Sequence, residues 1–285
     1  MTRTVHLLAI DPQNDFCDLP ADWHTRNPAT AVATGPALSV AGAHADMQRL
    51  ARFIGAQGRQ IDQITVTLDS HQRYDVAHPG FWRAADGAAV APFTPITAAQ
   101  VRAGAFVPVD AAALPRVLAY LDALEAQGRY TLMVWPVHCE IGSWGHGIHA
   151  DVLAACAVWQ ALRQRAVCNV FKGTNPWTKH YSAIQAEVPD ADDPDTALNP
   201  RLLAQLGSAD LLLIAGEASS HCVRATTEHI VQHLPRLQPG WTAERIVLLT
   251  DCMSPVGGFE AQHTAFLNAM RAQGAQLVNS SEISL

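Results

Sequence analysis

The chain has 285 residues, of which 49% are hydrophobic and 16% are charged, so it can bury a full core and lacks the composition of a disordered protein. Its net charge of −7 offers no basic surface for nucleic acid, and no apolar stretch is long enough to span a bilayer. Six cysteines without paired CxxC spacing, behind an N-terminus without a signal-peptide pattern, indicate reduced thiols in the cytoplasm. We therefore expect a soluble protein with no nucleic-acid or membrane partner.

Apolar segments of strand length recur along the chain, and segments with helical periodicity lie between them. The predicted strands are Val5–Ile10, Ile61–Leu68, Thr131–Trp135, Val167–Phe171, Leu211–Ile214 and Arg245–Leu249, with Gln276–Asn279 as a candidate final strand. The predicted helices cover residues 41–57, 114–127, 150–165, 199–206, 223–234 and 260–273. Strands that alternate with helices indicate an α/β fold with a parallel sheet covered on both faces.

Chemically reactive side chains follow five of the predicted strands. In chain order they are Asp11, then Asp69 with His71, then His138, then Lys172, then Cys222. In open parallel sheets the ligand lies beyond the carboxyl ends of the strands. Five strand ends that carry this set are hard to explain by packing, so they predict a functional site.

Lysine is rare in this sequence. Of the 19 basic residues only two, Lys172 and Lys179, are lysines. A compact, titratable ammonium differs chemically from a guanidinium, so two lysines close together raise the question of a role that arginine cannot fill. Chance is the alternative explanation.

The segment before Cys222 is rich in small and hydroxyl residues, which predicts a turn and a helix N-cap at Ser219 or Ser220. Free N–H groups and the helix dipole favour an anion at a helix N-terminus, so a thiol there tends toward thiolate. Cys222 is therefore the predicted nucleophile, and an inert buried cysteine is the alternative. Cys139 is a weaker rival, because it follows His138 at a strand end.

Asp11 and Lys172 could complete a catalytic triad with Cys222. An aspartate can take and return the thiol proton, and an ammonium stabilises both anions. The N–H groups of Ala218 and Cys222 could form an oxyanion hole. The alternative is a structural Asp–Lys ion pair beside an unreactive thiol.

A second set of residues has the composition of a metal site. Asp69 and His71 point the same way in an extended segment, His78 lies in a loop that could return to them, and His138 ends the neighbouring predicted strand. A mixed carboxylate and imidazole set suits Zn²⁺, Fe²⁺ or Mn²⁺ better than Mg²⁺ or Ca²⁺. We predict one divalent metal ion, with zinc as the first choice, and a chance DxH match as the alternative.

These residues belong to motifs that occur in a fixed order. The motifs are Asp11–Cys17 (DPQNDFC), Asp69–His71 (DSH), Trp135–Cys139 (WPVHC), Lys172–Gly173 with Tyr181–Ser182, and His221–Val223 (HCV). Together they resemble the nicotinamidases of the isochorismatase-like cysteine hydrolases, from residue 5 to about residue 280. The resemblance implies a three-layer, doubly wound, Rossmann-like fold with a six-stranded, mostly parallel sheet. It implies a single domain over residues 1–285, with insertions at about 83–130 and 142–166, and a cis peptide between Glu217 and Ala218.

The activity that the resemblance implies is hydrolysis of nicotinamide to nicotinate and ammonia through a thioester on Cys222, with a metal that binds the pyridine nitrogen. The residues that match the ring pocket are Phe16, Trp135, Tyr181 and His221, with Glu217 beside them. Glu217 replaces a small apolar residue, and a carboxylate beside the oxyanion hole could repel an anion or bind a more polar substrate. Another small amide, ureido or carbamoyl substrate is therefore the alternative, ahead of a non-catalytic binding protein. We also expect the chain to form homo-oligomers.

Overall fold

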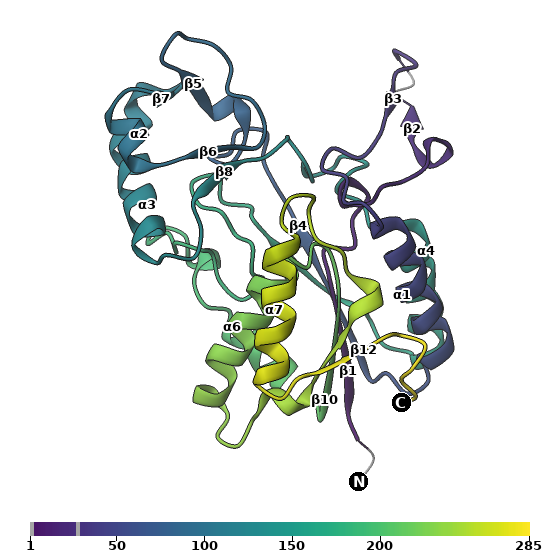
Figure 1. The fold of residues 1–285 in the computed structure, drawn as a ribbon. Helices are drawn as coiled ribbons and strands as arrows, with labels where there is room; N and C mark the ends of the chain where they lie inside the picture. The colour runs from purple at the N-terminus through teal and green to yellow at the C-terminus, as the bar shows by residue number, and fades with distance from the viewer. Residues whose placement is uncertain (1–2, 27–28) are drawn as a thin grey trace.

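The computed structural model describes residues 3–26 and 29–285 and is built around one six-stranded sheet (Figure 1). The strand order is β12–β11–β10–β1–β4–β9, and every neighbouring pair is parallel. The strands are β1 (Val5–Ile10), β4 (Gln63–Asp69), β9 (Cys168–Lys172), β10 (Leu211–Gly216), β11 (Ile246–Leu249) and β12 (Gln276–Val278). Because all residues of β1 and β10 are buried, these strands read in the sequence as unbroken apolar runs.

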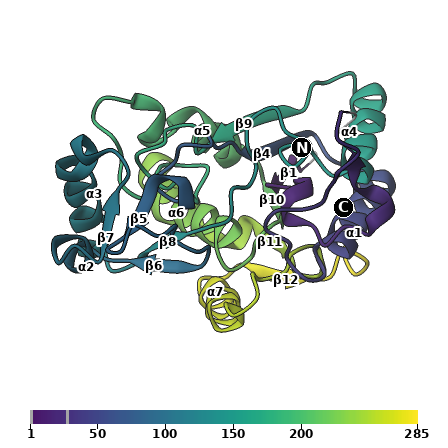
Figure 2. The same ribbon diagram turned by 90° about the horizontal axis from the view of Figure 1, so that it is seen from above.

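Helices cover both faces of the sheet, as Figure 2 shows from above. On one face lie α1 (Ala43–Gln57) and α4 (Ala150–Arg163), which pack against each other. The other face carries α5 (Pro200–Gly207), α6 (Cys222–Leu237) and α7 (Glu260–Ala272). The predicted three-layer, doubly wound α/β fold is confirmed, with an entirely parallel sheet.

The sheet changes its winding direction between β1 and β10. From β1 the chain adds β4 and then β9 on one side, whereas β10, β11 and β12 follow on the other side. Such a switch point opens a crevice at the carboxyl ends of the two central strands. The strands approach closely there, because a Cβ on Gly216 would lie 1.9 Å from the carbonyl oxygen of Ile10. Gly216 also has a φ of +120°, so only glycine suits this position.

Shorter elements lie beyond the carboxyl edge of the sheet, in the upper part of Figure 1. They form three two-stranded sheets with antiparallel pairing and two helices. The pairs are β2 (Thr25–Arg26) with β3 (Ala33–Thr34), β5 (Trp82–Ala84) with β7 (Phe106–Pro108), and β6 (Thr94–Ile96) with β8 (Leu132–Val134); the helices are α2 (Ala98–Arg102) and α3 (Leu114–Ala126). Residues 83–130, which we predicted to be an insertion, thus have secondary structure of their own, whereas residues 142–166 contain α4.

One strand prediction is wrong in its partner. Thr131–Trp135 does contain a strand, but this strand pairs with β6 and does not enter the main sheet. The sixth place in the sheet is taken by β12, which we had expected only as a candidate. Hydrophobic patterning shows that a segment is extended and buried, but it does not show which strand lies beside it.

No helix within residues 3–26 and 29–285 combines the length and the apolar character needed to cross a membrane. All six cysteines are free, as the sequence suggested.

Candidate active site

The structure brings Asp11, Lys172 and Cys222 together at the switch point. Asp11 follows the end of β1, Lys172 ends β9, and Cys222 is the first residue of α6. The Lys172 ammonium lies 2.8 Å from Oδ2 of Asp11 and 3.5 Å from Sγ of Cys222. A carboxylate oxygen of Asp11 lies within 4.8 Å of the same sulfur. All three side chains are buried, so a reaction among them would be shielded from bulk water.

The backbone and a neighbouring strand fix the carboxylate of Asp11. Its φ of 44° turns the chain sharply out of β1. The Thr67 hydroxyl donates a hydrogen bond of 2.5 Å to Oδ1 of Asp11, and the Asp11 amide donates to the Thr67 carbonyl. These contacts leave Oδ2 directed at Lys172.

Burial dominates the protonation of the triad. It raises the pKa of the Cys222 thiol well above its usual range; Lys172 lowers that pKa, and the charges of Asp11 and Asp69 raise it further. Burial and the two nearby carboxylates thus oppose the resting thiolate that the helix N-terminus led us to expect. Burial also raises the pKa of Asp11, although Lys172 opposes the shift. A carboxylate with a raised pKa is better suited to accept the thiol proton.

The turn before α6 has backbone donors without partners. Along this turn the amides of Glu217, Ser219 and His221 donate to backbone carbonyls. The amides of Ala218, Ser220 and Cys222 donate to no group among the described residues, and of these three residues Ala218 and Cys222 line the pocket described below. The bond between Glu217 and Ala218 is cis, as the resemblance implied. This geometry suits an oxyanion hole.

The predicted N-cap is wrong. The residue before α6 is His221, and its side chain makes no capping bond. The Ser220 hydroxyl accepts instead from the Val256 amide at 3.1 Å, and the Ser219 hydroxyl contacts Nδ1 of His263 at 2.7 Å. Both serines thus tie the turn to the region of α7 and the segment before it, a tertiary role that local sequence does not reveal.

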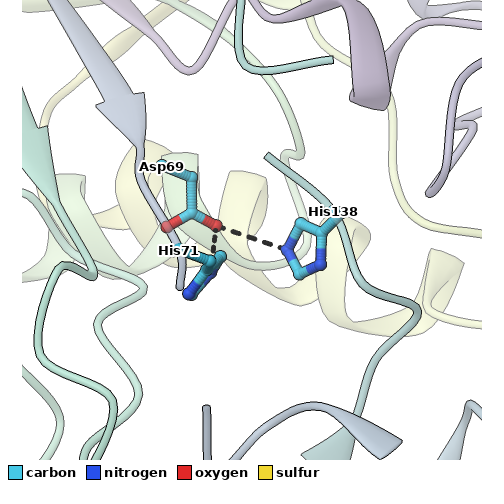
Figure 3. A group of neighbouring side chains, drawn as sticks. All are labelled: Asp69, His71 and His138. Carbon is cyan, nitrogen blue, oxygen red and sulfur yellow. Dashed lines mark hydrogen bonds and ion pairs between the residues drawn. The ribbon is translucent and has the colours of Figure 1, made fainter. Parts of the chain in front are cut away.

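Asp69, His71 and His138 form a cluster with ligand atoms within 4.8 Å of one another. Figure 3 shows both imidazole rings directed at one carboxylate oxygen of Asp69. Nε2 of His71 lies 3.0 Å, and Nε2 of His138 lies 3.4 Å, from Oδ2 of Asp69. Each of the three side chains is at most 2% exposed. This donor set matches the chemistry of Zn²⁺ and similar divalent ions.

The hydrogen bonds of the histidines turn Nε2 of each ring toward Asp69. Nδ1 of His138 lies 2.7 Å from the Pro136 carbonyl, and Nδ1 of His71 lies 2.9 Å from Oδ2 of Asp75. A carbonyl or carboxylate oxygen only accepts, so each Nδ1 carries a proton, and Nε2 is the ring nitrogen that faces Oδ2 of Asp69. Burial lowers the pKa of His138 to about 4, which keeps it neutral at pH 7.

His78 lies beside this cluster but does not belong to the group of ligand atoms that lie within 4.8 Å of one another. Its ring centroid lies 5.1 Å from that of His71 and 5.4 Å from that of His138. Nδ1 faces the Gln72 carbonyl at 3.2 Å, and Nε2 is buried without a partner in the described part of the chain. His78 thus adds a buried ring nitrogen without a partner beside the three ligand atoms, and the residues fit a divalent cation.

Sequence reasoning missed two residues of the cluster. Asp75 orients His71 through Nδ1, and the Lys179 ammonium lies 2.9 Å from Nε2 of the same ring. Asp75 follows His71 by four residues in a loop, and without regular secondary structure this spacing does not predict a contact. For Lys179 the sequence signal was the rarity of lysine, and both lysines of the chain contact Asp69.

A small pocket lies between Cys222 and the metal-type cluster, by which we mean Asp69, His71 and His138. Its empty volume is about 290 Å³, which includes the space that opens to solvent. All four predicted ring-pocket residues line it, namely Phe16, Trp135, Tyr181 and His221. Leu38, Lys179 and Val256 also line it, and none of these three was predicted. The pocket therefore presents mainly aromatic and apolar walls, with Cys222 at one side and polar groups at the other.

Glu217 does not line this pocket, so that prediction is corrected. The side chain is fully buried, and its carboxyl accepts a hydrogen bond from the Ser254 amide at 3.2 Å. Burial first, and then the charge of Asp46, raise the pKa of Glu217 well above its usual range. A buried carboxyl that contacts the Ser254 amide and does not line the pocket does not face an oxyanion there, so the sequence-based objection to an apolar amide no longer applies.

The sequence matches no protein-family model and no curated protein. The yeast nicotinamidase Pnc1p superposes with a TM-score of 0.63 at 17% identity, over 97% of this chain and 100% of that one. A nicotinamidase and pyrazinamidase from Acinetobacter baumanii gives 0.61 at 18% identity, with 98% of each chain covered. A Pyrococcus horikoshii pyrazinamidase in complex with zinc gives 0.53 at 16% identity, over 96% of this chain and 98% of that one. This chain has the nicotinamidase fold.

Within this nicotinamidase fold, the loop that carries Lys179 is backed by a buried carboxyl. The Glu187 amide donates to the Lys179 carbonyl at 2.9 Å, and burial raises the pKa of Glu187 from 4.5 to about 7, although Arg129 opposes the shift. A raised folded-state pKa contributes stability below pH 4.5 that is lost as pH rises through 7.

We therefore expect Glu187→Gln to raise the melting temperature on the order of 5 °C more at pH 8 than at pH 4. Thermal unfolding followed by circular dichroism at both pH values measures this difference. A gain of the same size at both pH values would show that folding does not change the pKa of Glu187.

Proposed function

We propose that this chain is a cysteine amidohydrolase of the nicotinamidase type, which converts nicotinamide and water to nicotinate and ammonia. The observation that carries the proposal is the position of Lys172, whose ammonium contacts Asp11 and Cys222 at the switch point of a nicotinamidase fold. The small aromatic pocket beside Cys222 supports a flat ring as the substrate.

In the first half-reaction Sγ of Cys222 attacks the carboxamide carbon. Asp11 accepts the thiol proton as the C–S bond forms, and Lys172 stabilises the charge of both groups. The oxygen of the tetrahedral intermediate is held by the amides of Ala218 and Cys222. Asp11 then returns the proton to the amide nitrogen, the C–N bond breaks, and ammonia leaves a thioester on Cys222.

In the second half-reaction a water molecule attacks the thioester carbon and gives a proton to Asp11. The C–S bond breaks and the carboxylic acid leaves. Asp11 passes its proton to the departing sulfur, and the product loses its own acidic proton to water. The raised pKa of Asp11 suits a group that must carry a proton in each half-reaction.

We propose that Asp69, His71 and His138, with His78 beside them, would hold one divalent ion, zinc first and iron or manganese otherwise. The donor set and the unpartnered Nε2 of His78 support this assignment, and the similar Pyrococcus horikoshii pyrazinamidase is in complex with zinc. When bound, the metal would supply a Lewis-acid contact for the ring nitrogen.

The alternative keeps the triad and changes the substrate to another small amide, ureido or carbamoyl compound. The observation that favours it is the position of Lys179 in the pocket wall, because an ammonium can donate a hydrogen bond to an oxygen of a more polar substrate. A panel of small amides that contains nicotinamide separates the two substrates by ammonia release.

The test of the proposal is ammonia release from nicotinamide by the purified protein. We expect turnover that falls after treatment with a chelator and returns when Zn²⁺ is added back. If zinc-loaded protein hydrolyses another amide of the panel but not nicotinamide, that amide replaces nicotinamide as the proposed substrate. If it hydrolyses no amide, the proposed amidohydrolase activity is wrong.

We also propose that the chain forms homo-oligomers. On α4, Val158 and Leu162 lie one helical turn apart at 64% and 40% exposure. Large apolar side chains exposed side by side on one helix suit a contact with a second copy of the chain. Sedimentation velocity measures the oligomeric state directly.

A further inference from the structure

Lys179 places a cation against the metal-type cluster. Its ammonium lies 2.9 Å from Nε2 of His71 and 3.5 Å from Oδ2 of Asp69. These are the same two ligand atoms that converge with Nε2 of His138. The side chain of Lys179 is 4% exposed, so its ammonium has little contact with water.

The contact with His71 uses the lone pair that a metal would need. An ammonium carries only donors and Nδ1 of His71 faces Asp75, so Lys179 contacts the ring at Nε2, the atom that also lies 3.0 Å from Oδ2 of Asp69. A ring nitrogen has a single lone pair. It can therefore accept from Lys179 or bind a metal ion, but it cannot do both.

The two cations also compete for one negative charge. Oδ1 of Asp69 is taken by Lys172 at 2.9 Å, so Oδ2 is the oxygen left for a metal, and Lys179 lies near it. A divalent ion bound there would meet the ammonium at short range in a poorly solvated site, where repulsion between like charges is strong. Metal binding therefore requires the ammonium to move.

Hydrogen bonds hold the backbone of Lys179, whereas its side chain can turn toward a second contact. Its amide donates to the hydroxyl of Tyr120, and its carbonyl accepts from Glu187. The ammonium lies 5.1 Å from the ring centroid of Tyr181, whose face attracts cations. A rotation of the side chain toward Tyr181 would release His71 without moving the loop.

We propose that Lys179 is an internal competitor of the metal: its ammonium occupies the His71–Asp69 side of the cluster, and a divalent ion binds only by displacing it. The chain then binds its metal more weakly than the three ligands alone would, and metal occupancy follows the concentration of free metal. The proposal rests on the metal site of the proposed function and is independent of the amide reaction.

The experiment is a titration of metal-free protein with Zn²⁺ alone, followed by calorimetry, with no substrate present. We expect Lys179→Met to bind one Zn²⁺ about 10- to 100-fold more tightly than the unaltered chain, comparable to the effect of changing a residue next to the ligands. Arg116→Met is the matched control, because it removes a partly exposed cation near the same loop that pairs with Asp190. Its zinc affinity should equal that of the unaltered chain.

Equal or weaker zinc binding by folded Lys179→Met overturns the proposal. If Lys179→Met does not fold, Lys179→Gln removes the charge, keeps a polar head group and is held to the same criterion. Co²⁺ in place of Zn²⁺ adds a spectroscopic check, because its visible absorption should reach full intensity at lower Co²⁺ in the variant. Failure of every variant to bind metal overturns both the competition and the metal site, whereas ammonia release alone decides the amidase.

Discussion

Cys222→Ala is expected to lower ammonia release by about 10⁴-fold or more, because the variant cannot form the covalent intermediate. The Lys172 ammonium would lose a contact at 3.5 Å but keep Asp11 and Asp69, so the fold should survive. Initial rates with saturating nicotinamide and the melting temperature, measured on the same preparation, separate loss of chemistry from loss of structure.

Cys139→Ala is the matched control. Cys139 is also a buried, free cysteine that follows a strand, but it does not line the pocket. Its activity should stay within a few-fold of the unaltered chain. Mass spectrometry of protein quenched during turnover should show an acyl adduct only while Cys222 is present. A Cys222→Ala variant with substantial activity would assign the chemistry to another group.

The strand ends could be predicted from the sequence because two physical rules meet there. Buried parallel strands appear as apolar runs, and their carboxyl ends share one edge. Asp11, Lys172 and Cys222 could therefore be grouped from the sequence alone, although they lie far apart in the chain. Asp69 and His71 belonged to the same edge by the same argument.

Tertiary pairing decided what the sequence could not. We expected His138 at the carboxyl end of a strand of the main sheet. It reaches the site from a loop after β8, which pairs with β6 outside that sheet. Glu217 sits beside the nucleophile in the chain, yet its side chain turns toward Asp46 and away from the pocket. Local sequence fixes the order of residues along a turn, but the side on which each side chain packs depends on neighbours far away.

The protonation state of the nucleophile shows the same limit. A helix N-terminus is visible in a sequence and favours thiolate. The depth of burial and the second carboxylate, Asp69, are visible only in the fold, and both raise the pKa of Cys222. A thiol with a raised pKa needs a base, which is the role proposed for Asp11.

Lys172→Met is expected to destabilise the protein as well as inactivate it. The Lys172 ammonium lies 2.8 Å from Asp11 and 2.9 Å from Asp69, and all three side chains are at most 2% exposed. Removing the cation leaves two buried carboxylates facing each other, which costs about 3–5 kcal/mol. For a domain of this size that corresponds to a fall in melting temperature of roughly 10 °C. Activity should fall at least about 10²–10³-fold, because the charge that stabilises both anions is lost.

The double variant Asp11→Asn/Lys172→Met tests whether the cost comes from the carboxylates. The first of these substitutions replaces a carboxylate by an uncharged amide, and Asp69 would keep its contacts with His71 and Lys179. Chemical denaturation of the two single variants and the double variant should give a coupling of about 1–3 kcal/mol, with the double variant more stable than Lys172→Met alone. Strictly additive losses would mean that Lys172 stabilises the fold through the packing of its stem. In that case its charge would serve only the chemistry at Cys222.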